Sequence, residues 1–239
     1  MTDPLNRSRM KIYKYFLIAI VVIVIDQTSK LLIHFNMNLH DEITVLGNDQ
    51  YGFKLHYLLN PGMAFGIRWK SEFGKLALTI FRIAAMFGIG YYLWRMGKRH
   101  AHPGFLLSMA LILGGAVGNV IDSTFYGVFL NNHPPDSPTP WFHGQVIDML
   151  YFPLFDFTIP HWVPFKGGEF FTFFSPVFNI ADSSIFIGVV IILLFQKRFF
   201  KDHLEDEHTT TTADETATTA APEEPLGNLS PTNTENPEA

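Results

Sequence analysis

Two aspartates stand inside apolar runs of the sequence, and they are the residues best suited to chemistry. Asp148 lies in residues 146–150 and Asp182 in residues 178–183, and no basic residue adjoins either. A carboxylate at the edge of hydrocarbon is costly, so it usually faces a partner or a water-filled cavity. Two carboxylates that approach closely cannot both ionise easily, and one of them keeps a proton. Such a pair can activate water and polarise a carbonyl, as an aspartic peptidase requires.

Other kinds of site are disfavoured by the sequence. The chain has no cysteine, which excludes disulfides, thiol nucleophiles and cysteine-ligated metals. There is no His-Glu-x-x-His run, and His100 and His102 lie in a predicted loop, so a zinc peptidase is not expected. Ser29 and Lys30 are neighbours, and adjacent residues of a helix do not face each other. We therefore expect no metal, no cofactor and no nucleic-acid partner.

The elements that must hold these aspartates are predicted to be membrane spans. The chain is 48% hydrophobic and only 16% charged, whereas soluble domains carry about a quarter of charged residues. The apolar residues fall in blocks close to the roughly 20 residues that cross a bilayer. Four blocks are predicted to span, at residues 15–33, 76–94, 105–121 and 183–195.

Basic residues flank these spans in a way that predicts one topology. They precede the first span, join the second to the third and follow the fourth. Because basic loops stay in the cytoplasm, both termini are expected inside. Arg82, within the second span, is expected to reach the outer interface or to pair with an acid.

The outer segments are predicted to contain a strand and long loops. Residues 51–59 alternate as a strand does and end in a turn at residues 60–62. Asp148 is expected in a long, aromatic outer loop that packs on the membrane surface. Residues 1–201 would form the membrane domain, and the polar residues 202–239 a disordered cytoplasmic tail.

Five polar clusters fall at one predicted depth, near the outer leaflet, which suggests a single site. They are residues 26–30, 60–66, 119–123, Asp148 and 179–182. Each has a structural alternative when taken singly. Asp26 could pair with Lys30 one helical turn on, and Asn60 with Gly62 could form only a turn.

In their order, the five clusters resemble the five boxes of the lipoprotein signal peptidases, the bacterial signal peptidase II family. The first three resemble its Asp-Gln-x-x-Lys, Asn-x-Gly-x-Ala-Phe and Gly-Asn-x-x-Asp boxes. The last two resemble the boxes that carry the family's catalytic aspartates. The resemblance covers residues 12–198 and implies a helical membrane protein with four transmembrane helices, a small extracytoplasmic β-sheet and long outer loops.

The resemblance also implies an intramembrane aspartic endopeptidase. Such an enzyme removes the signal peptide of a prolipoprotein, cutting before a cysteine that carries diacylglycerol. Asp148 and Asp182 would be its catalytic pair. Substrate binding or support of the site would come from Asp26, Lys30, Asn60, Gly62, Asn119, Asp122, Asn179 and Ala181. We expect a monomer in the bacterial inner membrane, in contact with lipid, with its active site near the outer leaflet.

The sequence departs from the family in two places. Ser123 stands where the family usually has arginine, and residues 131–140 and 160–176 look like extra loops. Two other functions compete with the peptidase. A proton-coupled transporter would spread its acids through the membrane depth, and an assembly factor would leave the paired acidic boxes without a purpose. Replacing either aspartate by asparagine would separate the three, because the peptidase would lose cleavage, the transporter would lose flux and the assembly factor would lose little.

Overall fold

The computed structural model describes residues 4–62, 72–164 and 166–199 of the chain. Four of the described helices are long and apolar enough to cross a membrane, which confirms the predicted helical membrane fold. These helices are α1 (Pro4–Asn36), α2 (Glu72–Lys98), α3 (Pro103–Ile121) and α5 (Ile180–Phe199). The predicted tail, residues 202–239, lies outside the described residues.

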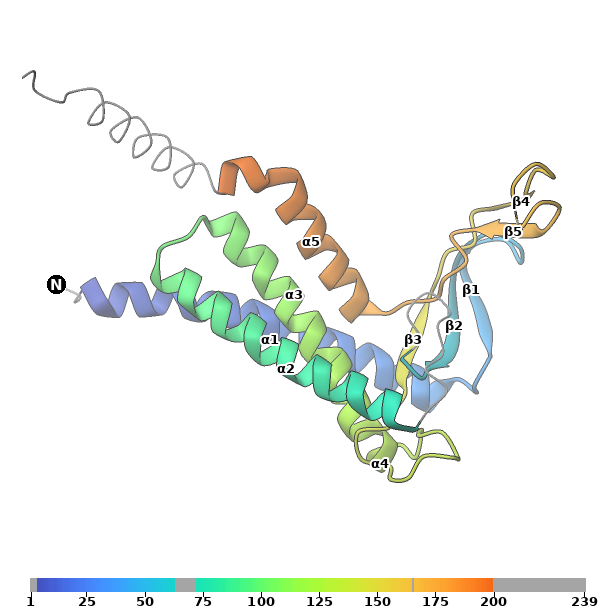
Figure 1. Cartoon of the computed structure of the whole chain (residues 1–239), viewed down its shortest axis with the longest axis horizontal. Helices are drawn as coiled ribbons and strands as arrows, with labels where there is room; N and C mark the ends of the chain where they lie inside the picture. Colours follow the sequence, from blue (N-terminus) through green and yellow to red (C-terminus); the bar gives the residue numbers. More distant parts are fainter. Residues whose placement is uncertain (1–3, 63–71, 165, 200–239) are drawn as a thin grey trace, which may run out of the picture. The chain divides into compact units, whose positions relative to one another are not determined.

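Helix α3 is the centre of the bundle and packs against α1, α2 and α5 (Figure 1). Its glycines make this close packing possible. A Cβ atom on Gly118 would lie 2.5 Å from a carboxylate oxygen of Asp26, on α1. A Cβ atom on Gly115 would collide with the backbone of Ala181, on α5. Small residues therefore let helices carrying polar groups approach one another, as in other membrane bundles.

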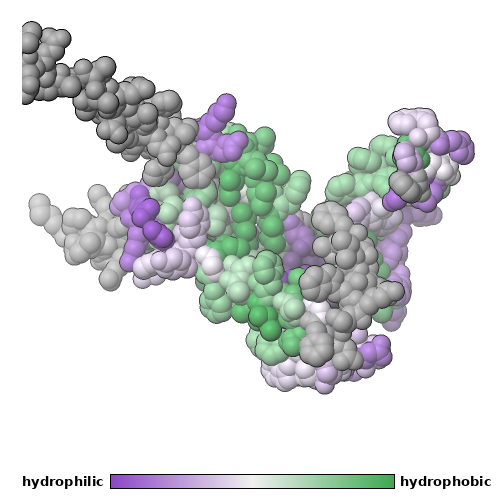
Figure 2. All heavy atoms as spheres, viewed as in Figure 1, coloured by the Kyte–Doolittle hydropathy of each residue, from purple (hydrophilic) through white to green (hydrophobic). Residues whose placement is uncertain are grey.

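The outward faces of the helices are apolar. Figure 2 shows hydrophobic residues gathered over the helices, with hydrophilic residues toward their ends. Large side chains such as Phe81, Phe87, Phe186 and Leu194 are more than two-thirds exposed. A surface of this kind is stable in hydrocarbon, and it explains why the four spans could be found from composition.

Helix α3 does not end where its apolar run ends. It continues through a π-helical turn, η1 (Asp122–Tyr126), into the short helix α4 (Gly127–Phe129). Asp122, Ser123 and Tyr126 are buried in this turn. Single π-helical turns occur often at functional sites, where the extra residue re-aims the side chains. This continuation was not predicted.

A three-stranded antiparallel sheet lies beyond one end of the bundle, in the order β1–β2–β3. Its strands are β1 (Glu42–Gly47), β2 (Gly52–Asn60) and β3 (Val146–Tyr151). Strand β2 confirms the predicted strand. The expectation of a loop around Asp148 is wrong, because Asp148 lies in β3 opposite Leu58. Side chains alternate along a strand, so Ile147 and Met149 enter the hydrophobic core while Asp148 faces the other way.

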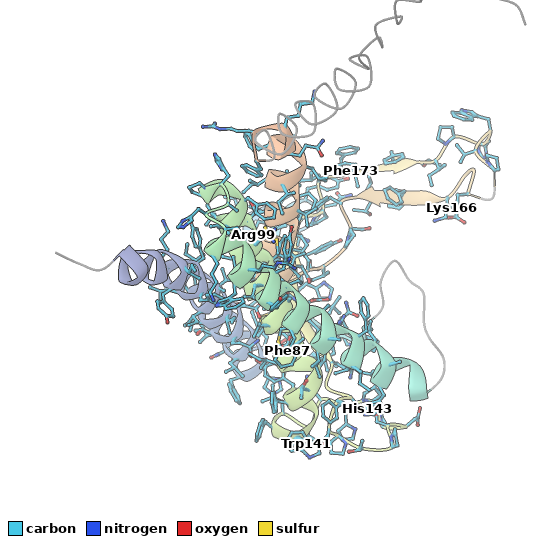
Figure 3. All side chains as sticks on the ribbon, turned by 60° about the vertical axis from the view of Figure 1, so that its left-hand side comes forward. Phe87, Arg99, Trp141, His143, Lys166 and Phe173 are labelled. Atoms are coloured by element: carbon cyan, nitrogen blue, oxygen red, sulfur yellow. The ribbon has the colours of Figure 1, made fainter. Side chains whose placement is uncertain are left out.

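A second, two-stranded sheet is formed by β4 (Phe155–Thr158) and β5 (Phe170–Phe173). Phe155 pairs with Phe173, labelled in Figure 3, and Phe157 pairs with Phe171. These four phenylalanines share one face of the hairpin, and each is between 38% and 50% exposed. The opposite face carries Asp156, which accepts hydrogen bonds from Gln50 and Tyr51. The hairpin is therefore amphipathic, with its aromatic face uncovered.

Candidate active site

Asp148 and Asp182, hereafter the aspartate pair, are brought together by the junction between β3 and α5. The backbone N–H groups of Met149 and Leu150 both donate to the carbonyl of Phe178, at 3.0 and 2.7 Å. This tie places Asp148 beside the first turn of α5, which carries Asp182. Residues far apart in the sequence thus meet through three backbone hydrogen bonds, since Phe178 N–H also donates to Leu150.

Asn179 links the Asp148 carboxylate to the backbone of Asp182. Its Nδ2 donates to Asp148 Oδ1 at 2.7 Å, and its Oδ1 accepts from the backbone N–H of Asp182 at 2.9 Å. The second bond is the N-cap of α5, where asparagine is among the preferred residues. The first turn of a helix also favours a negative charge, and Asp182 lies in the first turn of α5, where a carboxylate is stabilised.

Asp148 is the more enclosed member of the aspartate pair. It is only 3% exposed, and its Oδ2 accepts from Asn60 Nδ2 at 3.0 Å. Burial first, and then the charge of Asp182, raise the pKa of the Asp148 carboxyl to about 7. Hydrogen bonds from the two asparagines oppose this rise without cancelling it. Asp148 can therefore hold a proton near neutral pH.

Asp26, Lys30 and Asp122, hereafter the lysine cluster, lie fully buried beside the aspartate pair. Lys30 Nζ is 2.7 Å from Asp26 Oδ2 and 2.7 Å from Asp122 Oδ2. All three side chains are 0% exposed. Asp26 thus pairs with Lys30 one turn on, as predicted, and Asp122 joins them from η1. A buried charge needs a partner of this kind, because an unpaired one is strongly destabilising.

Neutral groups complete the lysine cluster. Gln27 Nε2 donates to Asp122 Oδ1 at 2.8 Å, and Tyr126 OH donates to Gln27 Oε1 at 2.9 Å. The backbone N–H of Ala181 donates to Asp26 Oδ1 at 2.8 Å. Tyr126 was not singled out in the sequence. The sequence does contain a signal for it. Tyr126 follows Asp122 by four residues, a spacing that puts two side chains on one helix face.

Asn119 connects the lysine cluster to the aspartate pair. Its Oδ1 accepts from Lys30 Nζ at 3.2 Å, and its Nδ2 donates to Asp182 Oδ1 at 2.8 Å. On the opposite side, Asn60 Oδ1 accepts from Gly62 N–H at 2.9 Å in a tight turn. Gly62 has φ +93°, a conformation that glycine adopts without strain. Asn60 therefore forms a turn and holds Asp148 at once.

All ten residues singled out in the sequence thus converge on one network of contacts. Members of all five polar clusters take part, although residues 63–66 of the second cluster lie outside the described residues. The predicted behaviour of Arg82 is only partly met. Its Nη1 donates to Ser123 Oγ at 2.8 Å, and no direct ion pair with an acid is found among the described residues.

Comparison with known proteins gives a consistent family. A family model described as signal peptidase (SPase) II matches residues 18–198. A lipoprotein signal peptidase of Amoebophilus asiaticus is 44% identical over 207 residues, covering 85% of this chain and 86% of its own. The enzyme of Porphyromonas gingivalis is 41% identical over 191 residues, covering 76% and 81%. That of Chlorobaculum parvum is 31% identical over 188 residues, covering 78% and 97%.

A solved structure described as a bacterial membrane enzyme has a similar fold. It aligns with a TM-score of 0.50 at 24% sequence identity, covering 77% of this chain and 88% of its own. The likeness supports the helical membrane architecture.

Proposed function

The chain belongs to the signal peptidase II family, and from this premise we propose that the aspartate pair is the catalytic dyad with which it removes lipoprotein signal peptides. One observation carries the proposal. Asn179 donates to the Asp148 carboxylate and accepts from the backbone N–H of Asp182, which holds the two carboxylates near enough for their charges to repel, with only a neutral amide at this junction. Carboxylates in that arrangement share one proton, as an aspartic peptidase requires.

The pair can divide acid and base roles between its members. Asp148, buried and with its pKa raised to about 7, carries the shared proton. Asp182 is partly exposed, so a water molecule can reach its carboxylate. Asp182 takes a proton from this water as the oxygen attacks the scissile carbonyl, and Asp148 gives its proton to the carbonyl oxygen. Collapse of the tetrahedral intermediate then breaks the C–N bond. The amine leaves with the proton held by Asp182, and one hydroxyl of the intermediate returns its proton to Asp148 as the carbonyl forms again.

The substrate is proposed to be a prolipoprotein whose cysteine carries diacylglycerol, with cleavage just before that cysteine. The distribution of charge supports a site near the outer leaflet. Arg95, Lys98 and Arg99 stand where α2 ends, at the opposite end of the helices from Trp141 and His143 (Figure 3). Basic ends of spans face the cytoplasm. The aspartate pair, at the end that carries the sheet, would then face outward, with both termini inside.

Contact with lipid and a monomeric state are part of the same proposal. The uncovered aromatic face of the β4–β5 hairpin suits the interfacial region of a bilayer, where aromatic side chains concentrate. All the groups of the aspartate pair and the lysine cluster come from one chain. A single copy therefore suffices for catalysis.

The test is cleavage of a purified diacylglyceryl-modified prolipoprotein by the unaltered protein and by Asp148→Asn and Asp182→Asn. We expect cleavage before the lipidated cysteine, with a loss of at least about 10³-fold in each variant, because neither amide can exchange the required proton. Asp136→Asn, which removes an exposed carboxylate in the loop after α4, is the matched control and should cleave normally. Thermal unfolding of each purified variant establishes that it is folded.

The outcomes separate the alternatives. If either dyad variant is folded and cleaves at the rate of Asp136→Asn, the assignment of the dyad is wrong. If the folded, unaltered protein cleaves no lipid-modified precursor, the proposed substrate is wrong. Cleavage of an unmodified precursor at the same rate would show that diacylglycerol is not recognised.

A further inference from the structure

Arg82 brings a guanidinium to the aspartate pair from an element that the site otherwise does not use. It lies on α2, is partly buried, and donates from Nη1 to Ser123 Oγ at 2.8 Å. A Cβ atom built on Gly62 would lie 3.9 Å from Arg82 Nη2. The guanidinium therefore sits between the turn that holds Asn60 and the start of η1.

A short chain of hydrogen bonds connects this guanidinium to Asp182. Ser123 Oγ accepts from Arg82 and donates to the carbonyl of Asn119 at 2.8 Å. The Asn119 side chain in turn donates to Asp182 Oδ1 at 2.8 Å. The serine hydroxyl thus fixes the guanidinium against the same residue that orients the Asp182 carboxylate.

The charge of Arg82 acts on both members of the aspartate pair and on Asp122 of the lysine cluster. It interacts most strongly with Asp182, then with Asp122, then with Asp148. The other cation close to these acids, Lys30, is already held between Asp26 and Asp122 at 2.7 Å from each. Arg82 is therefore the cation available to Asp182 among the described residues.

We propose that Arg82 is a positioning residue of the dyad, whose guanidinium stabilises the negative charge of Asp182 so that the shared proton resides on Asp148. This inference rests on the proposed function. It gives a reason why two neighbouring carboxylates take different roles, Asp182 as the base and Asp148 as the acid. It also accounts for Ser123, where the signal peptidase II pattern led us to expect an arginine, because the hydroxyl there receives a guanidinium from α2.

Several titratable or charged groups surround the dyad and can influence its protonation. They come from every element packed against it and are Asp26 and Lys30 on α1, Lys75 and Arg82 on α2, Asp122 and Tyr126 on η1, Asp148 on β3 and Asp182 on α5. Of these, Lys75 interacts with Arg82, and the lysine cluster is internally paired. The guanidinium is thus the group whose removal should change the dyad with the least disturbance elsewhere.

The experiment measures kcat, KM and the pH–rate profile of the full chain in lipid or detergent, with a diacylglyceryl-modified precursor as substrate. Arg82→Met is expected to lower kcat by about 10- to 100-fold, with KM changed less than about threefold. Without the guanidinium the charge of Asp182 is less stable, so the acidic limb of the profile should move up by about one pH unit. Arg95→Met, on the same helix and exposed, is the matched control and should match the unaltered protein.

Two further variants test whether the charge itself is responsible. Arg82→Lys keeps the charge and should keep the acidic limb in place. Arg82→Met combined with Ser123→Arg returns a guanidinium to the same space from η1, since Ser123 Oγ contacts Arg82 Nη1, and should bring the limb back. If Arg82→Met does not fold, this double variant decides, because a folded double variant with a displaced limb overturns the proposal.

The inference can fail independently of the proposed function. If Asp148→Asn and Asp182→Asn are inactive while folded Arg82→Met has the kcat and acidic limb of Arg95→Met, only the role of Arg82 is wrong. A change in KM alone, with an unmoved profile, would likewise overturn it, because a positioning role acts on the dyad and not on binding. If the two aspartate variants remain active, the dyad itself is wrong, whatever Arg82 does.

Discussion

The lysine cluster and the aspartate pair are each built around two carboxylates, and they differ in what connects them. In the lysine cluster an ammonium group lies 2.7 Å from each carboxylate. In the aspartate pair the side-chain amide of Asn179 joins the Asp148 carboxylate to the backbone N–H of Asp182. An ammonium compensates both charges, whereas an amide leaves their repulsion in place. The first arrangement fixes charge, and the second leaves a proton to be exchanged.

On the proposed assignment of the dyad, burial alone does not identify a catalytic carboxylate. Asp26 and Asp122 are both 0% exposed, more enclosed than either member of the aspartate pair. What distinguishes Asp182 is partial exposure, which admits water, and what distinguishes Asp148 is a raised pKa without an ammonium beside it. The lysine cluster holds α1, α3 and α5 together, and the aspartate pair uses the rigidity that results.

The contrast predicts its largest effect on stability at Lys30. In Lys30→Met, two buried carboxylates lose their shared cation, which should lower the free energy of unfolding by about 3 to 5 kcal/mol. Thermal or denaturant unfolding in detergent would measure this loss. Lys14→Met, exposed and on the same helix, is the matched control and should change stability by less than about 0.5 kcal/mol. If Lys30→Met and Lys14→Met had the same free energy of unfolding, the lysine cluster would have no structural role.

The next effect concerns the pH dependence of stability and is expected at Asp148. Its folded-state pKa is raised from 3.8 to about 7, so between these values the folded chain holds a proton that the unfolded chain has lost. The contribution to stability is fully present below pH 4 and is lost as the pH rises through 7, and it amounts to on the order of 4 kcal/mol. The unfolding temperature of the unaltered protein should fall over this window.

Asp148→Asn isolates that contribution, because the amide does not titrate. The variant should lose most of the decline in unfolding temperature between pH 5 and pH 8, while Asp136→Asn should keep it. A decline of the same size in both variants would mean that Asp148 does not hold a proton in the folded protein. Catalytic function would then have to be assigned on other grounds.

The sequence could predict the parts of this molecule that depend on local pattern. The four spans follow from apolar runs, and the pairing of Asp26 with Lys30 follows from their spacing on one helix. The convergence of the five clusters followed from their common depth. None of these needs knowledge of how the helices pack.

The parts that could not be predicted depend on contacts between distant segments. Strand β3 is buried on both faces, so it lacks the alternation that marks a half-buried strand, and its pairing with β2 is long-range. The π-helical turn that buries Asp122 and Ser123 has no pattern of its own. The contact between Arg82 and Ser123 exists only because α2 packs on α3. Charge alone suggested an acid as the partner of Arg82, whereas packing supplied a hydroxyl.

The smallest effect is a shift in the pKa of Asp148, and it is expected when Asn60 is replaced. Its hydrogen bond lowers the pKa of Asp148, so Asn60→Ala should raise that pKa by less than about one unit. Asp148 would then keep its proton to higher pH, and the alkaline limb of the pH–rate profile should move upward. Asn60→Asp keeps an acceptor for Gly62 N–H but adds a negative charge, so its shift should be larger. An alkaline limb unmoved in both variants would mean that Asp148 is not the acid.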